Sequence, residues 1–363
     1  MLLYEHSHWT DFIWDDAVIA PLLSDVRFAQ GKLLGRVADL GFTVDTPLEV
    51  NALSSEIVAS SRIEGVTLEA KAVRSSVARQ LGLDDFDRTV STHPVDGAVS
   101  VMLDATQNFA EPLTSDRLSA WHAALFPTGY SGLHKITVAH WRTAPMDIVS
   151  GPIGHEKIHY AAPDAARVPH LMDELIAWFN ESSTAPLAKA AIAHLWFLTV
   201  HPFDDGNGRI ARVLTEMLLA RSDDSPRRFY SMASYILNHR ENYYAALEKA
   251  QHGTSDITEW LRWFLEALLH SLQNGESAVN EALARSAWWH AIEGVSLNER
   301  QRLVLQKLLG SFEGKLTTRK WAKLCKVSPD TALRDINDLI AKGLLVRDDA
   351  AGGRSTSYKL NAR

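Results

Sequence analysis

The segment HPFDDGNGRIAR, residues 201–212, gathers one histidine, two acids, two glycines and two arginines directly after an apolar stretch. This combination suits a nucleoside triphosphate. Such a ligand needs backbone N–H groups at a helix N-terminus, glycines that let phosphates approach, cations for the outer phosphates and an acid to hold Mg²⁺. Gly206, Asn207 and Gly208 open a predicted helix, so its first N–H groups face the preceding loop.

The charged side chains of this segment suit different steps of one reaction. Arg209 and Arg212 lie three residues apart. They therefore share a helix face, and arginine can fork onto phosphate oxygens. Asp205 would repel phosphate unless a metal ion bridges the two. His201 could take a proton from an incoming hydroxyl, and Phe203 would point inward as an anchor.

Three other interpretations of the segment compete with a triphosphate site. GNGRIA fits the loose dinucleotide pattern G-x-G-x-x-A, with Asp224 beyond it, but that pattern follows a strand and AKAAIAHLWFLTV is typical of a helix. An EF-hand loop fails, because Phe203 and Leu214 occupy positions that need acids. A plain helix-helix turn with Asp and Asn caps explains the glycines, but neither the arginines nor the histidine.

At every defining position the segment resembles the signature of Fic-domain proteins: His, any residue, Phe, any residue, an acid, Gly, Asn, Gly, Arg, two of any kind, Arg. The resemblance implies a protein adenylyltransferase that moves AMP from ATP to a Ser, Thr or Tyr hydroxyl of a target protein, its own chain included. It implies Mg²⁺ as the metal ion. Carried over by position, His201 is the base, Asp205 holds the metal, Gly206, Asn207 and Gly208 form the anion hole, and Arg209 and Arg212 bind the outer phosphates.

A second short motif, SSRIEG, closes a helix predicted over about residues 47–64. At its start Thr46 fits an N-cap, Pro47 the first helical position and Glu49 the capping-box partner. Gly65 is a natural stop. Glu64 in the last turn faces the negative end of the helix dipole, so it needs a nearby cation.

Ser60, Glu64 and Gly65 resemble the inhibitory motif of Fic proteins, here on the N-terminal side of the catalytic motif. The resemblance implies that Glu64 pairs with Arg212 and leaves ATP in an unproductive pose. Taken alone, the pattern also fits a surface glutamate near a helix end. Two alternatives for the whole site stay open: Glu64 positions a water that removes AMP from modified proteins, or the pocket only senses nucleotide for a winged-helix regulator.

Residues 146–163, MDIVSGPIGHEKIHYAAP, break the helical pattern with two apolar runs around the turn-forming SGPIG, which predicts a hairpin. The hairpin resembles the Fic flap, which holds a target segment by strand addition. A plain connecting hairpin is the alternative. By the resemblance, the backbone contacts to the target would come from Ile148, Val149, Ser150 and Gly151.

The helix RENYYAALEKAQ resembles the adenine-side helix of Fic proteins. This makes Tyr243, Tyr244 and Gln251 candidates for nucleotide contacts. Neighbouring tyrosines at helical spacing fit a hydrophobic core equally well.

The predicted fold class is mainly α: a Fic-type helical domain with a short β-hairpin flap, preceded by N-terminal helices and followed by a winged helix-turn-helix. Trp9, Phe12 and Trp14 would anchor the N-terminal helices. The predicted boundaries are 1–100 for the N-terminal helical region, 101–275 for the Fic domain, 276–297 for a linker helix and 298–363 for the winged helix-turn-helix.

The C-terminal segment is basic within an acidic chain. Residues 298–363 carry 14 Lys and Arg against seven Asp and Glu, so a total of -7 leaves -14 on the first 297 residues. A recognition helix over Thr331–Lys342 would present Arg334, with Arg354 on the wing and lysines for phosphate contacts. Acids on that helix oppose DNA, so protein contact or dimerisation is the alternative. The lysines are Lys320, Lys323 and Lys326, and the acids are Asp330, Asp335 and Asp338.

The remaining features of the sequence indicate where in the cell we expect the protein. Cys325 is the single cysteine and forms no internal disulfide, the N-terminal residues lack the pattern of a signal peptide, and no apolar run approaches the roughly 18 residues of a membrane span. We therefore expect a cytoplasmic protein without a membrane partner. The resemblance favours a homodimer.

Overall fold

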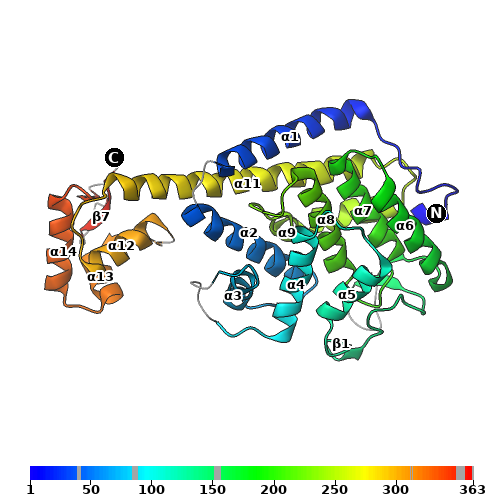
Figure 1. The fold of residues 1–363 in the computed structure, drawn as a ribbon, viewed down its shortest axis with the longest axis horizontal. Helices are drawn as coiled ribbons and strands as arrows, with labels where there is room; N and C mark the ends of the chain where they lie inside the picture. The colour runs from blue at the N-terminus through cyan, green and yellow to red at the C-terminus, as the bar shows by residue number, and fades with distance from the viewer. Residues whose placement is uncertain are drawn as a thin grey trace. The chain divides into compact units, whose positions relative to one another are not determined.

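The computed structural model describes residues 1–38, 42–83, 89–150, 157–310, 312, 314–348 and 356–361, with the backbone only at 42–45 and 150. In these ranges the chain is mainly α, as predicted, with short antiparallel strands beside helices α1 to α14 (Figure 1). Contacts divide it into two compact units, Met1–Val279 and Asn280–Arg363.

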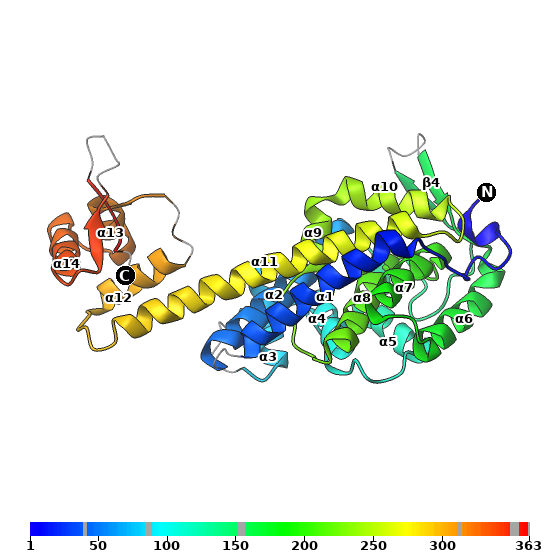
Figure 2. The ribbon, with the colours of Figure 1, turned by 90° about the horizontal axis from the view of Figure 1, so that it is seen from above.

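In the first unit, helices α7 (Pro186–Val200) and α8 (Asn207–Asp223) form the centre and are joined by the loop 201–206. Almost every side chain of both is buried, because other helices cover them (Figure 2). Such all-round burial explains why α7 is apolar on every face. The surrounding helices are α1 (Asp16–Ala38), α2 (Phe42–Ile63), α3 (Ala70–Gln80), α4 (His93–Gln107), α5 (Ser115–Leu125), α6 (Val168–Glu181), α9 (Met232–Asn238), α10 (Arg240–Gln251) and α11 (Thr258–Ala291), with 3-10 turns at Leu3–Glu5 and Ala165–Arg167.

The predicted start of the helix that carries SSRIEG is wrong. Helix α2 begins at Phe42, so Pro47 lies inside it and Thr46 is not its N-cap. Proline lacks a backbone N–H, and a helix tolerates this loss best near its start. One turn of α2 can therefore precede Pro47. Glu49 makes an ion pair with Arg227, with 2.8 Å between Oε2 and Nε, in place of the predicted capping box. Glu49 therefore attaches the side of α2 to Arg227.

The hairpin predicted at 146–163 is confirmed in the described residues. Strand β3 (Asp147–Ser150) pairs antiparallel with β4 (Lys157–Ala161), with a register shift after Ile148. Gly151 lies outside the described residues. A second small hairpin, not predicted, pairs β1 (Tyr130–Ser131) with β2 (His134–Lys135).

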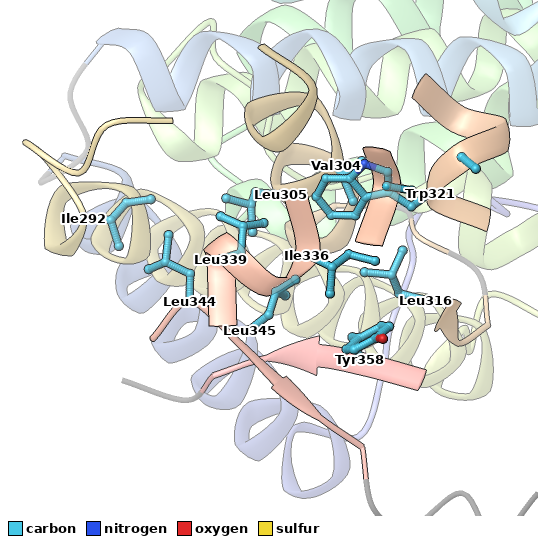
Figure 3. Close-up of a cluster of buried hydrophobic side chains, with 12 residues drawn as sticks. Ile292, Val304, Leu305, Leu316, Trp321, Ile336, Leu339, Leu344, Leu345 and Tyr358 are labelled. Atoms are coloured by element: carbon cyan, nitrogen blue, oxygen red, sulfur yellow. The ribbon is translucent and has the colours of Figure 1, made fainter. Parts of the chain in front are cut away.

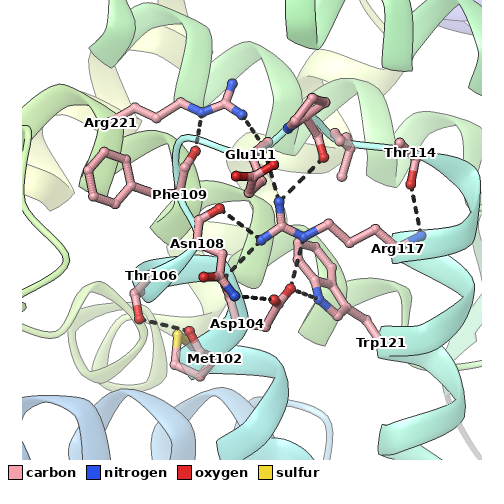
Figure 4. Close-up of polar contacts among 12 residues, drawn as sticks. Met102, Asp104, Thr106, Asn108, Phe109, Glu111, Thr114, Arg117, Trp121 and Arg221 are labelled. Carbon is pink, nitrogen blue, oxygen red and sulfur yellow. Dashed lines mark hydrogen bonds and ion pairs between the residues drawn. The ribbon is translucent and has the colours of Figure 1, made fainter.

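The connection between α4 and α5 is fixed by Arg117 (Figure 4). Its Nε donates to Asp104 Oδ2 over 2.8 Å, and its Nη2 donates to the carbonyl oxygens of Asp104 and Asn108. The indole of Trp121 donates to the same Asp104 oxygen over 2.7 Å. These bonds fix the position of α5, which carries His122, relative to the end of α4.

The second unit has the predicted helix-turn-helix and its pair of strands. Its three-stranded sheet has the order β5-β7-β6, of which β5 was not predicted. Buried Trp321, Ile336 and Tyr358 are at the centre of its core (Figure 3). The elements are α12 (Glu299–Leu309), β5 (Leu316–Thr317), α13 (Thr318–Cys325), α14 (Pro329–Ala341), β6 (Leu345–Arg347) and β7 (Ser357–Leu360).

Two boundaries differ from the sequence prediction near this unit. Helix α11 runs without a break from Thr258 to Ala291, so the predicted separate linker helix at 276–297 is the end of a longer helix. Helix α14 begins at Pro329, after the N-cap Ser328. Across the part of the chain that is described, no helix has both the length and the apolar character needed to cross a membrane.

Candidate active site

His201 is the first residue after α7 and has a left-handed backbone, with φ at 50°. Its Nδ1 lies 3.3 Å from the carbonyl oxygen of Leu198, which can only accept, so Nδ1 carries the proton. Burial lowers the pKa of His201 to about 4. At neutral pH the ring is therefore uncharged, and Nε2 is left as a proton acceptor.

The loop after His201 is closed by the side chain of Asn207. Its Oδ1 accepts from the Phe203 amide over 2.9 Å, and its Nδ2 donates to the Phe203 carbonyl over 2.7 Å. Gly206 has φ at 80°, a conformation that favours glycine, and an added Cβ would lie 2.7 Å from the ring of Phe126. The glycine and the asparagine of the motif thus shape the loop that precedes α8.

Asp205 is held from two sides by residues that the sequence interpretation missed. Ser131 of β1 donates to its Oδ2. The ring of His122 stacks on Phe203, with centroids 4.1 Å apart, and contacts the Asp205 carbonyl over 3.1 Å. His122 Nδ1 accepts from the amide of Ala139, so its Nε2 is the donor. No local motif marks these residues, because hairpin folding and α5 packing bring them here.

The first turn of α8 offers donors to an anion. The first N–H groups of a helix have no acceptor within the helix. Arg209 lies on this turn with its guanidinium 4.6 Å above the ring of Phe126, and burial lowers its pKa. Its Nε is buried and has no hydrogen-bond partner among the described residues. This orphaned donor and the helix start fit an anionic ligand.

Arg212, 2% exposed, is joined to the end of α2. Its Nη2 lies 2.6 Å from Glu64 Oε1 and donates to the Ser60 carbonyl over 2.9 Å, while its Nε donates to Ser60 Oγ over 2.8 Å. Burial disfavours the charge of Arg212, but the carboxylate of Glu64 holds its pKa above the usual value. The structure thus contains the pair that the sequence led us to expect.

Glu64 also fills space at the start of α8. A Cβ added to Gly208 would lie 2.0 Å from Glu64 Oε1 and 3.3 Å from Arg212 Nη1. Only glycine lets the carboxylate come so close to this turn. Gly65 follows with φ at 76°, which ends α2 and turns the chain away. The same space beside Arg212 and the helix N-terminus is where a phosphate would bind.

The three candidates on α10 take different places. Tyr243 is buried, and its hydroxyl lies 2.8 Å from His194 Nε2. Gln251 is also buried and donates to the Leu198 carbonyl over 3.2 Å. Tyr244 is 38% exposed. Of the three, Tyr244 has the exposure that a contact with a bound base requires, while the other two support the core and α7.

Three of the flap candidates, Ile148, Val149 and Ser150, lie on β3. In the described sheet β3 pairs with β4 alone, and Val149 is 48% exposed while Ile148 is half-buried. An unpaired strand edge can take an added strand. Ser150 ends β3.

Behind Arg212 lies a small cavity of about 10 Å³, room for about one water. Glu56 of α2 and Glu216 of α8 both line it. Glu56 Oε2 accepts from Ser231 Oγ and from the Ala233 amide, both over 2.8 Å, which ties α2 to the start of α9. Burial, and then the charge of Glu216, raise the pKa of Glu56 to about 8.

Comparison with known proteins first defines the class. The chain is similar to the crystal structure of a Fic family protein from Desulfovibrio desulfuricans, with a TM-score of 0.54 and 21% identity over 95% of this chain and 96% of that one. Residues 112–219 match the Fic/DOC family, and residues 300–353 match the DeoR-like helix-turn-helix domain. The chain therefore contains a Fic domain and a C-terminal helix-turn-helix domain. Residues 2–83 match a domain of unknown function, DUF4172.

Several relatives with assigned names match about a hundred residues of this chain. Protein adenylyltransferase fic-1 of Caenorhabditis elegans is 34% identical over 105 residues, which is 28% of this chain and 19% of that protein. A probable protein adenylyltransferase of Aquifex aeolicus is 30% identical over 103 residues, 28% of this chain and 30% of that one. The matches thus span less than a third of these relatives' lengths.

The raised pKa of Glu56 predicts a pH-dependent stability. In the folded chain the carboxyl binds a proton up to about pH 8, whereas the unfolded group has a pKa near 4.5. Its contribution is therefore complete below pH 4.5 and is lost as pH rises through 8. Over that window the free energy of unfolding falls by up to about 1.4 kcal/mol per pH unit. Glu56→Gln, which stays neutral, escapes this loss.

Thermal unfolding of both proteins between about pH 5.5 and 8.5 measures the effect. We expect the Tm of Glu56→Gln to gain on that of the unchanged chain as pH rises. Glu69→Gln, at an exposed glutamate, is the control and keeps a constant difference. Parallel curves for all three proteins would contradict the assignment.

Proposed function

We propose that the chain is a protein adenylyltransferase, a nucleotidyltransferase that moves AMP from ATP to a Ser, Thr or Tyr hydroxyl of a target protein. The observation that carries this proposal is the neutral His201 beside a helix start with an orphaned arginine donor. The names of the relatives that match the Fic region support it.

The reaction follows from the side chains in place. His201 Nε2 accepts the proton of the target hydroxyl as its oxygen attacks the α-phosphorus of ATP in line. A new P–O bond forms to the target, the bond to the β-phosphate oxygen breaks, and pyrophosphate leaves. Arg209, Arg212 and the first N–H groups of α8 hold the phosphates, so catalysis consists mainly of positioning and charge stabilisation.

Asp205 would hold Mg²⁺, which neutralises charge on the phosphates when it is bound. Mg²⁺ commonly takes one or two carboxylates and completes its shell with phosphates and water. Asp205 supplies one such carboxylate, directly before the phosphate-binding start of α8. The hydroxyl of Ser131 on Asp205 Oδ2 aligns the carboxylate.

We propose further that Glu64 inhibits this reaction. Glu64 forms an ion pair with Arg212, the cation that an outer phosphate of ATP needs, and its carboxylate repels that phosphate. Arg212 already has Ser60 and Glu64 as partners, so ATP must displace one charged contact before the γ-phosphate can align. The resting chain therefore binds ATP in an unproductive pose, and release of the end of α2 activates it.

Removal of Glu64 should expose this activity. We expect Glu64→Gly to raise self-modification by labelled ATP and Mg²⁺ at least about tenfold, the effect of one charge-assisted bond of about 1.4 kcal/mol. His201→Ala in the same background should abolish labelling, because no base remains. Mass spectrometry that locates an added AMP identifies the acceptor residue.

Glu69→Gly is the matched control for this experiment, since it removes an exposed glutamate from the neighbouring turn. Its labelling should equal that of the unchanged chain. Equal labelling in the Glu64 and His201 variants would refute both roles. ATP binding without covalent transfer in Glu64→Gly would favour a nucleotide sensor, and release of AMP from a premodified target would favour the reverse reaction.

For the second unit we propose DNA contact through the helix-turn-helix. Two of the three acids of α14 already have partners, which supports the proposal: Asp335 is buried against Arg300, and Asp338 accepts from Gln301 and Lys342, while Asp330 is exposed. The exposed positions of α14 include Arg334 and Asn337, which can read base edges. Arg354 of the wing lies outside the described residues. We also propose that the chain forms a homodimer, which would present two helix-turn-helix units to the DNA.

A charge reversal tests the DNA proposal. The chain should shift mixed-sequence duplex DNA at about 50 mM salt and lose affinity steeply towards about 200 mM. Lys323→Glu with Lys326→Glu should weaken binding at least about tenfold, because both exposed lysines face phosphate in this docking mode. Arg285→Glu, which reverses a single charge on α11, is the control. Absence of any shift at low salt would refute DNA contact.

A further inference from the structure

The end of α7 is held by side chains from three other parts of the first unit. The last carbonyl groups of a helix have no donor within it. Here Gln251 donates to the Leu198 carbonyl over 3.2 Å, and the Tyr160 hydroxyl of β4 donates to the Thr199 carbonyl over 2.7 Å. Arg142 supplies the next two donors. The three main-chain carbonyls that precede His201 therefore each accept a hydrogen bond from a side chain outside α7.

Arg142 holds both sides of the catalytic histidine. Its Nε donates to the His201 carbonyl over 2.8 Å, and its Nη2 donates to the Val200 carbonyl over 3.3 Å. Its own amide donates to the Pro202 carbonyl over 2.8 Å. Three consecutive peptide units around His201 thus depend on one residue that lies far from the motif in the sequence.

The partners of Arg142 differ from those of the buried Arg212 and Arg228. It is 1% exposed, and its remaining bonds go to the carbonyls of Ala144 and Pro163. Among the described residues, no carboxylate lies within ion-pair distance of its guanidinium, whereas Arg212 and Arg228 each have such partners. A buried charge without a counter-ion is costly. The negative end of the α7 dipole and its carbonyls offset that cost.

This arrangement has two consequences for His201. Its backbone is left-handed, a conformation that a residue with a side chain keeps only where its surroundings impose it. Burial is the largest cause of the lowered pKa of His201, and the positive charge of Arg142 lowers that pKa further because it opposes a second positive charge on the imidazole. One side chain therefore affects both the direction and the charge of the ring.

We propose that Arg142 is a positioning residue for the transfer reaction: it holds His201 in the left-handed conformation that presents Nε2, and its positive charge lies beside the His201 backbone. The inference rests on the proposed role of His201 as the base. The residue acts through His201 and makes no contact of its own with the reacting groups. Arg142→Met, of similar length but without charge, removes both effects, and Arg142→Lys retains the charge but not the forked donors.

The kinetic test uses these variants in the Glu64→Gly background. We expect Arg142→Met to lower kcat by about a hundredfold, the effect of a small misplacement of a catalytic group, with the KM for ATP changed less than about threefold. The acidic limb of its pH profile should move to higher pH, because the ring protonates more easily. Added guanidinium should restore part of kcat, and Arg142→Lys should keep the pH profile but not the rate.

Arg117→Met is the matched control. Arg117 also donates to several main-chain carbonyls in the first unit, around the α4–α5 connection. Its loss should lower the Tm but leave kcat and the pH profile unchanged. If Arg142→Met behaves in the same way, with a lower Tm and an unaltered kcat, Arg142 is a helix cap alone and the proposal is overturned.

NMR of the chain with isotope-labelled histidine gives a readout that needs no turnover. The signals of His201 are identified by their loss in His201→Ala. In the unchanged chain they should show a neutral ring protonated at Nδ1, and in Arg142→Met the pKa should rise by about one unit. An unaltered titration in Arg142→Met would refute the proposed charge effect. If Glu64→Gly transfers no AMP, the adenylyltransferase proposal fails, while this titration still decides the effect of Arg142.

Discussion

The burial of one positive charge, on Arg212, organises the first unit. A guanidinium that leaves water needs hydrogen bonds and a counter-charge, and here the end of α2 supplies both through Ser60 and Glu64. The position of α2 follows from this requirement. Glu56 ties the middle of that helix to α9, and Glu49 ties its beginning to Arg227. An acidic helix is thereby placed against a helix that suits phosphate.

The same charge explains how binding and inhibition can compete in the proposed function. The site has a helix start, two arginines and a glycine that leaves space, and Glu64 uses part of each. Arg212 cannot form full ion pairs with the phosphates of a ligand and with the carboxylate of Glu64 at the same time. Two buried acids, Glu56 and Glu216, line the cavity behind Arg212, and the pKa of Glu56 is raised by burial and by the charge of Glu216.

A second set of contacts fixes the other side of the site. The carbonyls at the end of α7 are occupied by Gln251, Tyr160 and Arg142, which come from α10, β4 and the segment before β3. The hairpin and the histidine loop are therefore parts of one rigid arrangement. Arg142 lies outside the motif, but its hydrogen bonds hold the backbone of His201, the base of the proposed reaction.

Local patterns predicted much of the fold because they report local physics. The helical stretch AKAAIAHLWFLTV before the motif was predicted correctly, and so was the hairpin at 146–163 from its apolar runs and turn residues. The start of α2 was wrong, since Pro47 is tolerated within an early turn. The sequence could not show that Asp335 is buried against Arg300 or that Asp338 pairs with Lys342, because both partners come from the packing of the second unit.

By itself the sequence determined the residue types of the site: a histidine, an acid, two glycines and two arginines at spacings that one loop and one helix turn impose. It also suggested that Glu64 needs a cation. Only the tertiary structure decided that Arg212, 148 residues away, lies within reach, and that Arg142, His122 and Ser131 hold the loop. The reason is physical, because helical spacing fixes neighbours over a few residues, while contacts across the chain depend on how whole helices pack to bury their apolar faces.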